Sequence, residues 1–256
     1  MTPASRGFTD HFAQVADHYA AHRPTYPPAL FDWLSGQVPV RDLAWDCATG
    51  TGQAAGELAR RFNRVVATDA SSGQIAAATP CAGVEYRAAP AEQSGLEAGS
   101  VDLITVAQAL HWFDLDRFYA EVRRVLKPGG LLAVWTYGVF GTEGGEDTAA
   151  VQQMLHTFYY ETVGPYWPPQ RRHVENGYAD LAFPFAPVTV PAFSMAVAWR
   201  LADLAGYLRS WSATARYREL HGSDPVEALE RELRPLWGAG RRQVVWPLAI
   251  RAGRLS

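Results

Sequence analysis

Residues 43–53 read Leu-Ala-Trp-Asp-Cys-Ala-Thr-Gly-Thr-Gly-Gln. The apolar run at its start ends at Asp46 and has the length of a buried strand. From Gln53 to Phe62 the pattern predicts a helix. Between them, Gly50 and Gly52 let the backbone approach a ligand, and the amides of a helix N-terminus offer donors to it. The stretch predicts a strand, a ligand-binding turn and a helix, although a tight turn without a ligand has the same spacing.

Strands and helices alternate on the carboxyl side of this turn. The apolar runs predict strands at 65–69, 84–87, 101–106 and 131–136, with helices at 75–78 and 117–126. Residues 127–130 read Lys-Pro-Gly-Gly and end the second of these helices, because Pro cannot continue a helix and paired glycines permit positive φ. This alternation indicates parallel strands joined by right-handed crossovers, which is a doubly wound sheet.

The flanking segments predict a lid and a cap. Residues 8–19 and 30–36 have helical patterns, and later helices are predicted at 148–162, 201–211 and 225–233. Residues 188–199 and 243–250 are predicted to form an antiparallel, hairpin-like edge of a seven-stranded sheet whose other five strands are parallel. We expect a single domain over 1–256, with lid helices in 1–37, a cofactor-binding core in 40–137, and cap helices with the last two strands in 138–256.

Composition excludes several classes of function. The chain has 256 residues, 48% of them hydrophobic, a net charge of −3 and scattered basic residues, whereas a duplex-binding surface gathers a basic excess on one face. No window approaches the ~18 apolar residues that span a bilayer, and no signal-peptide pattern is present. Cys47 and Cys81 lack metal-ligand spacing. We expect a cytoplasmic monomer or homodimer with a small-molecule partner, and no nucleic acid, membrane or metal.

Two acids frame the predicted turn and narrow its ligand. Asp69 ends the second strand, where a carboxylate can accept hydrogen bonds from ribose hydroxyls, although it could instead cap the helix that follows. A dinucleotide site usually has a third glycine where this chain has Ala55, but some variants allow alanine, so this position alone does not decide the ligand. Asp46 would repel a pyrophosphate. It suits a cationic ligand such as S-adenosylmethionine, which carries an ammonium group and a sulfonium.

Residues 43–53, 66–69, 100–112 and 126–130 resemble, in order, the motifs of class I S-adenosylmethionine-dependent methyltransferases, which have a Rossmann-like doubly wound fold with a cap over the active site. Residues 19–27, 107–113 and 207–212 are most similar to the trans-aconitate methyltransferase-like branch. Two departures stand out. Ala48 replaces the usual first glycine, which is tolerable at negative φ, and residues 88–91 lack the usual acid after the third strand.

The resemblance implies a role for each matching residue. Asp46, Ala48 and Gly50 would surround the methionine moiety, and Gly52 and Gln53 would close the turn. The other implied cofactor contacts are Asp69 to the ribose, Ala70 near the adenine, the backbone of Ala91 and Glu92 to the adenine, Gln108 to the methionyl end, and Tyr19 and Arg23 as a lid.

The chemistry of the methyl acceptor determines which catalytic groups the enzyme needs. Methyl transfer from a sulfonium is an in-line displacement, so alignment is the main task. An ionised carboxylate needs no general base, and cationic groups would hold it: Arg23, His111, Arg209 and Arg216 are candidates. For a phenol or amine, His111 could remove the proton.

We therefore assign His111 and Arg23 to catalysis, and His111, Trp112, Trp211 and Arg216 to substrate binding. Each has a structural alternative: a loop-bonding histidine, a core tryptophan or a surface ion pair. The predicted function is methylation of a small molecule, with a carboxylate oxygen as the favoured acceptor. The alternatives are an NAD(P)-dependent oxidoreductase and a catalytically silent binding protein of the same fold.

Overall fold

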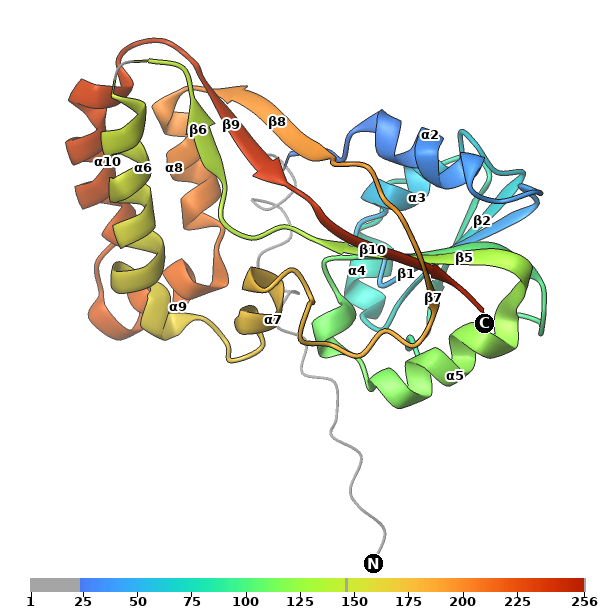
Figure 1. Ribbon diagram of the computed structural model, residues 1–256. Coiled ribbons are helices and arrows are strands. Elements are labelled where there is room, and N and C mark those ends of the chain that lie inside the picture. Colours follow the sequence, from blue (N-terminus) through green and yellow to red (C-terminus); the bar gives the residue numbers. More distant parts are fainter. Residues whose placement is uncertain (1–23, 146, 256) are drawn as a thin grey trace, which may run out of the picture.

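The computed structural model describes residues 24–145 and 147–255 (Figure 1). Its main sheet has seven strands in the order β3-β2-β1-β4-β5-β10-β7. The parallel strands are β1 (Leu43–Cys47), β2 (Arg64–Asp69), β3 (Val84–Ala88), β4 (Val101–Ala107) and β5 (Leu126–Thr136). Next to β5 lies the antiparallel strand β10 (Ala249–Arg254), which pairs in turn with the edge strand β7 (Ala186–Val188). The predicted doubly wound sheet is confirmed.

Helices cover both faces of this sheet because its strands are apolar on both sides. On β5, Leu131, Ala133 and Trp135 pack with one buried cluster, and Leu132 and Val134 pack with the other. The first cluster is covered by α2 (Pro28–Gly36) and α3 (Gln53–Leu58), and the second by α5 (Leu115–Val125). The short helix α4 (Ser72–Ala76) follows β2. In Figure 1, α2 and α5 lie on opposite sides of the sheet.

The predicted edge hairpin is wrong in one respect. Residues 194–199 and 242–247 do pair antiparallel, as β8 (Ser194–Trp199) and β9 (Arg242–Pro247), but they form a second sheet with β6 (Gly141–Glu143), in the order β6-β9-β8. The cause is Pro247, which lacks an N–H donor and ends β9. Leu248 then donates to the carbonyl of Phe193, and the chain continues as β10 in the main sheet.

The remaining helices gather beyond the carboxyl ends of the parallel strands (Figure 1). They are α6 (Thr148–Thr157), which continues as the π-helical turn η2 (Phe158–Thr162), then α8 (Leu201–Arg209), α9 (Ser212–His221) and α10 (Pro225–Trp237). The short elements η3 (Gly164–Tyr166) and α7 (Arg171–Glu175) interrupt a segment for which the sequence predicted no helix. Helix α9 was also not predicted. The expected helix at 8–19 lies outside the described residues.

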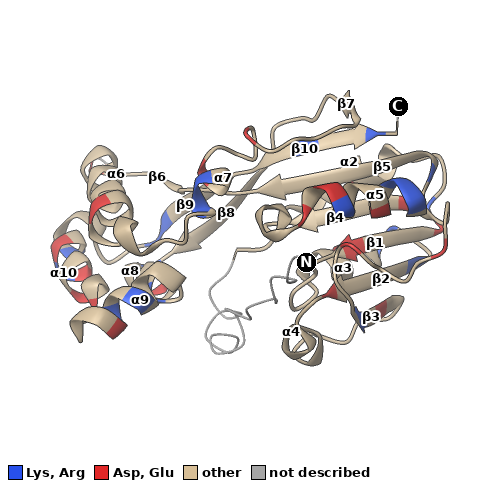
Figure 2. Ribbon diagram, turned by 90° about the horizontal axis from the view of Figure 1, so that it is seen from below, with Lys and Arg blue, Asp and Glu red and all other residues tan. Residues whose placement is uncertain are grey.

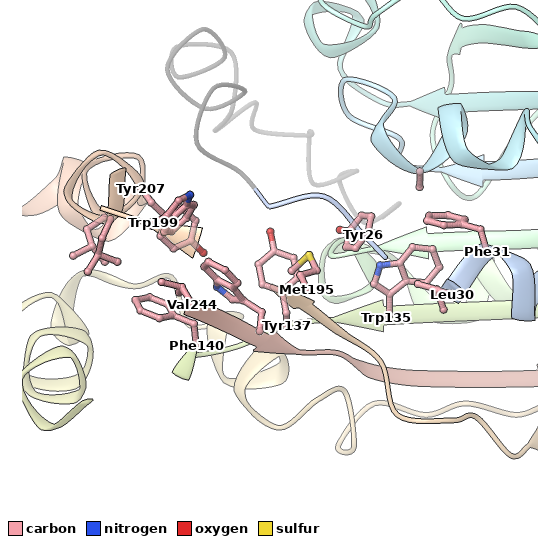
Figure 3. Packing of buried hydrophobic residues seen from close by; sticks show 14 of the residues in the cluster. Tyr26, Leu30, Phe31, Trp135, Tyr137, Phe140, Met195, Trp199, Tyr207 and Val244 are labelled. Carbon is pink, nitrogen blue, oxygen red and sulfur yellow. The ribbon is translucent and has the colours of Figure 1, made fainter. Parts of the chain in front are cut away.

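One apolar cluster joins the cap helices to the sheet. Figure 3 shows it as a row of side chains that runs from Phe31 and Trp135 past Tyr137 to Phe140 and Tyr207. Edge-to-face ring contacts link Tyr26 to both Trp135 and Tyr137. No helix within 24–145 or 147–255 is long and apolar enough to cross a membrane. The division into lid, core and cap within one domain stays a prediction.

Candidate active site

The glycine turn between β1 and α3 has three residues in the left-handed region. Gly50 has a φ of 56° and Gly52 a φ of 92°. Ala48 has a φ of 56°, so the condition of a negative φ, under which alanine is easily tolerated here, is not met. A side chain in this region costs free energy, and such strain is concentrated at functional sites. The amide of Thr49 donates to the carbonyl of Thr68 at 2.9 Å, which ties the turn to β2.

Asp46 lies at the carboxyl end of β1 and is 1% exposed. Its two carboxylate oxygens accept hydrogen bonds from the hydroxyls of Thr49, at 2.6 Å, and Thr105, at 2.7 Å. Burial raises the pKa of Asp46 to about 6, against the two threonine hydrogen bonds, which lower it, and the charge of Asp69 raises it further. The site therefore holds a carboxylate whose charge a bound cation would stabilise. Thr105, a polar residue within an apolar strand, was missed as a partner.

Asp69, at the end of β2, shapes the turn from the other side. One carboxylate oxygen accepts from the amide of Gly50 and the other from the amide of Ser71, both at 2.9 Å. The residue that caps α4 is Ser71 and not Asp69: the Ser71 hydroxyl accepts a hydrogen bond from the amide of Gln74 at the start of that helix. Each carboxylate oxygen has a second lone pair, so ribose binding by Asp69 stays a prediction.

The other predicted cofactor contacts surround this turn. Gln53 begins α3, and its side-chain amide donates to the carbonyl of Pro24 at 3.2 Å. Ala70 is exposed beside Asp69, and Ala91 is buried among apolar side chains. The carboxylates of Asp46, Glu92 and Asp69 add to burial in raising the pKa of the Cys47 thiol.

Glu92 thus lies within electrostatic reach of the turn and supplies an acid after β3, where residues 88–91 have none. One of its oxygens accepts from the amide of Asp114 at 3.0 Å. The sequence interpretation gave Glu92 only a backbone role.

Gln108 follows β4, as predicted, and its contact with the methionyl end of the cofactor stays a prediction. Its backbone has a φ of 60° just after β4. Its side-chain nitrogen donates to the carbonyl of Tyr137 at 3.0 Å, and its oxygen accepts from the amide of Tyr137 and the hydroxyl of Thr136. These bonds of the Gln108 side chain fix the end of β5 against the end of β4.

His111 lies in the 3-10 turn η1 (Leu110–Trp112) after β4, and its Nδ1 is 3.0 Å from the hydroxyl of Tyr178. Burial lowers the pKa of His111 to about 3, and the charges of Arg171 and His173 lower it further. At this pKa the imidazole is neutral at physiological pH, so it would bind an acceptor by hydrogen bonding and not by charge, and its assignment to catalysis and substrate binding stays a prediction.

The sequence interpretation missed Tyr178. This residue is fully buried with a φ of 63°. Its left-handed backbone is the one local sign that the position is special, and sequence alone does not display it.

The remaining substrate candidates are dispersed. Trp112 is 40% exposed and stacks near His111, with ring centroids 4.8 Å apart. Trp211 precedes α9 and packs on Trp167 at 5.4 Å. Arg216 is exposed on α9 and reaches the carbonyl of Tyr166 at 3.5 Å.

Arg209 is committed to ion pairs, at 2.6 Å with Asp224 and at 3.2 Å with Glu230, so its proposed role with an acceptor is wrong. Tyr19 and Arg23 lie outside the described residues. Within 24–145 and 147–255, no three acidic, Cys or His side chains gather as a metal site.

Comparison with known proteins agrees with this geometry. Residues 45–134 match the methyltransferase domain family. A protein of Dictyostelium discoideum named as a methyltransferase is 36% identical over 233 residues, which cover 90% of this chain and 88% of that protein. An uncharacterized methyltransferase of Mycobacterium tuberculosis is 38% identical over 139 residues, or 53% of this chain and 56% of that one.

A solved structure of a protein from Anaeromyxobacter dehalogenans, described as a type II methyltransferase, has a TM-score of 0.85 with this one. The two chains are 43% identical, and the match covers 91% of this chain and 98% of the other. The motif order, the doubly wound sheet and these matches together show that the chain belongs to the class I S-adenosylmethionine-dependent methyltransferases.

Proposed function

We propose that this enzyme transfers the methyl group of S-adenosylmethionine to a carboxylate oxygen of a small organic acid. The observation that carries the cofactor site is the pair of acids at the ends of neighbouring strands: Asp46 on β1 and Asp69 on β2, on either side of the turn 48–52. A positively charged nucleoside fits between them, whereas the phosphates of a dinucleotide would meet two carboxylates.

The residues of the site favour alignment over proton transfer. S-adenosylmethionine, when bound, supplies a methyl group that is already activated for displacement. Asp46 would bind its ammonium group and Asp69 its ribose, and the turn at Ala48 and Gly50, which has little side-chain bulk, would leave room for the methionine moiety. Tyr19 and Arg23 would cover it.

An ionised acid needs no base, and the low pKa of His111 supports an acceptor of that kind over a phenol or amine. The resemblance to the trans-aconitate methyltransferase-like branch points the same way. We also propose that the chain folds as a single domain, that the enzyme is cytoplasmic and that it is a monomer or a homodimer. The thiols of Cys47 and Cys81 are both free.

Ligand titration by calorimetry tests the cofactor site. We expect S-adenosylhomocysteine to bind with a micromolar dissociation constant, about −8 kcal/mol, and NAD not to bind. Asp69→Asn should weaken S-adenosylhomocysteine by at least tenfold, because charge-assisted hydrogen bonds to a ribose contribute roughly 1.5–3 kcal/mol. Asp116→Asn, an exposed acid of α5, is the matched control and should bind as the wild type does.

Incubation with methyl-labelled cofactor and a set of organic acids, phenols and amines tests the reaction. Label should pass to an acid and give an ester. Binding of NAD without S-adenosylhomocysteine would mean an oxidoreductase. Tight S-adenosylhomocysteine binding with no label transferred to any compound would mean a silent binding protein.

A further inference from the structure

We infer that Arg171, stacked on Trp167, is the residue that binds the anionic group of the methyl acceptor. This inference rests on the proposed function and assigns it a residue that determines substrate class: the acceptor is an organic acid with a flat or apolar portion next to its carboxylate. Four observations carry it.

The first observation is the state of the other cations near the strand ends. His111 is neutral at physiological pH. Arg209 is bound by Asp224 and Glu230. Arg216 is exposed on α9, with one nitrogen near a backbone carbonyl. Of the candidates within the described ranges, none offers a positive charge at the site.

The second observation is how Arg171 is held. Its Nε donates to the hydroxyl of Tyr159 at 2.6 Å, and that hydroxyl donates to Glu175 at 2.8 Å. The guanidinium lies 4.6 Å from the ring centroid of Trp167 and 5.4 Å from that of Tyr159. Stacking of this kind orients an arginine and removes water from its faces.

These contacts use only one of the three guanidinium nitrogens. The two terminal nitrogens of Arg171 donate to no acceptor within residues 24–145 and 147–255. Two such nitrogens in a rigid plane match the two oxygens of a carboxylate, which gives bidentate hydrogen bonds. The side chain is therefore oriented by the protein and still has its carboxylate-binding edge available.

The third observation is an unsatisfied donor beside this arginine. The indole nitrogen of Trp167 is buried and has no hydrogen-bond partner in the described part of the chain. A buried donor left unpaired costs about 1–3 kcal/mol. Among the described residues, Trp135, Trp237 and Trp246 have the same unpaired indole nitrogen, but of these four rings Trp167 is the one that lies against an arginine with unpaired terminal nitrogens. The Trp167 ring packs against Trp211 at 5.4 Å and Tyr159 at 5.5 Å, which supplies an aromatic wall. An anion held by Arg171 would lie beside this aromatic wall.

The fourth observation is position. Arg171 begins α7, which lies between the cap helices and the carboxyl ends of the parallel strands (Figure 1). Its charge lowers the pKa values of both His111 and Tyr178, so it acts electrostatically on the segment that follows β4. In doubly wound folds, ligands bind at the carboxyl ends of the strands. The arginine therefore lies near the segment after β4, at the end of the sheet where we expect the acceptor to meet the methyl group.

Calorimetry on the enzyme saturated with S-adenosylhomocysteine tests the inference. Benzoate, trans-cinnamate and succinate are the probes, with benzamide and cinnamamide as neutral counterparts. We expect at least one acid to bind, and for an aromatic acid its amide to bind at least tenfold more weakly. Arg171→Gln should weaken that acid at least tenfold, and Arg171→Lys by less, since a lysine keeps the charge without the planar fork.

Two further variants act as controls. Arg172→Gln, the exposed neighbour on the same helix, should bind the acid as the wild type does. Trp167→Phe keeps the ring and removes the donor, and should weaken the acid two- to fivefold. All variants should bind S-adenosylhomocysteine within twofold of the wild type, which shows that the fold and the cofactor site are intact.

The outcomes separate this inference from the proposed function. If the wild-type enzyme does not bind S-adenosylhomocysteine, the proposed function itself is contradicted. If the cofactor product binds but no acid does, or if Arg171→Gln and Arg172→Gln bind the acid equally, Arg171 is not the anion-binding residue. Loss of S-adenosylhomocysteine binding in Arg171→Gln alone would overturn the inference too.

Discussion

At the residue scale, Ala48 is held in a conformation that favours glycine. Its φ is 56°, and an L-residue in this region costs roughly 1–2 kcal/mol relative to the right-handed regions. We expect Ala48→Gly to raise the free energy of unfolding by about 0.5–1 kcal/mol, because the relief of strain exceeds the entropy that glycine loses on folding. Urea denaturation measures it.

The same substitution elsewhere provides the control for Ala48→Gly. Ala120→Gly, at an exposed position inside α5, should lower the free energy of unfolding by about 1 kcal/mol, the usual cost of glycine within a helix. A loss of stability in both variants would show that Ala48 is not strained.

Asp46 gives a prediction about pH. Its pKa is raised to about 6 in the folded protein, so the folded state binds more protons than the unfolded state between roughly pH 4 and 6. Stability from this group is present below that window and is lost as the pH rises through 6. Asp46→Asn should therefore stabilise the cofactor-free enzyme at pH 8, by on the order of 2 kcal/mol, and weaken S-adenosylhomocysteine binding.

Urea unfolding at pH 5 and pH 8 measures this effect. The gain from Asp46→Asn should shrink at pH 5, where the carboxyl group is already protonated for most of the time. A gain of equal size at both pH values, or a loss at pH 8, would contradict the assignment of the shift to burial of the charge.

Single residues also show why sequence reasoning reached only part of the site. Asp46 and Asp69 were found because they adjoin the glycine turn along the chain, in a pattern with a physical reason. Arg171 and Tyr178 lie in a segment with many prolines and no periodicity, and only tertiary packing brings them near β4. Gln108 occupies the expected position, but its hydrogen bonds to β5 depend on a neighbour that the sequence does not specify.

At the scale of elements, capping fixes where α10 begins. Asp224 accepts from the amide of Val226 at 3.1 Å and from Arg209 at 2.6 Å, so it joins α10 to α8. We expect Asp224→Ala to lower the free energy of unfolding by about 1–2 kcal/mol through loss of the cap. Asp224→Asn keeps a cap acceptor and loses only the charge, so its cost should be smaller. Thermal or urea unfolding distinguishes them, and equal costs would contradict a capping role.

Elements were predicted well where a local signal marks both ends. The start of α10 was predicted from Asp224 and the proline that follows it, and the parallel strands were predicted from their apolar runs. Pro247 was noticed within the last predicted strand, but the sequence does not say that the chain changes sheets there. Helix α9 was missed because its apolar face is short: only Ala213 and Thr214 are buried.

At the scale of the whole molecule, charge is mixed and the apolar interior is continuous. Figure 2 shows basic and acidic residues interspersed along α5, α9 and α10. The sheet and the cap share one buried cluster, whose aromatic side chains include Trp135, Tyr137, Phe140 and Trp246. Composition predicted a large core, but the sharing of that core between two structural parts follows only from the fold.

This shared interior limits how the enzyme can admit its substrates. If the cap swung outward as a rigid body, a continuous layer of packed aromatic rings would separate. Trp246 and Tyr137, which are both nearly inaccessible to solvent, would then be exposed to water. Separation of the cap from the sheet would therefore resemble partial unfolding more than a hinge motion. We therefore expect entry and exit to use small rearrangements of surface segments, with the cap and the sheet moving together.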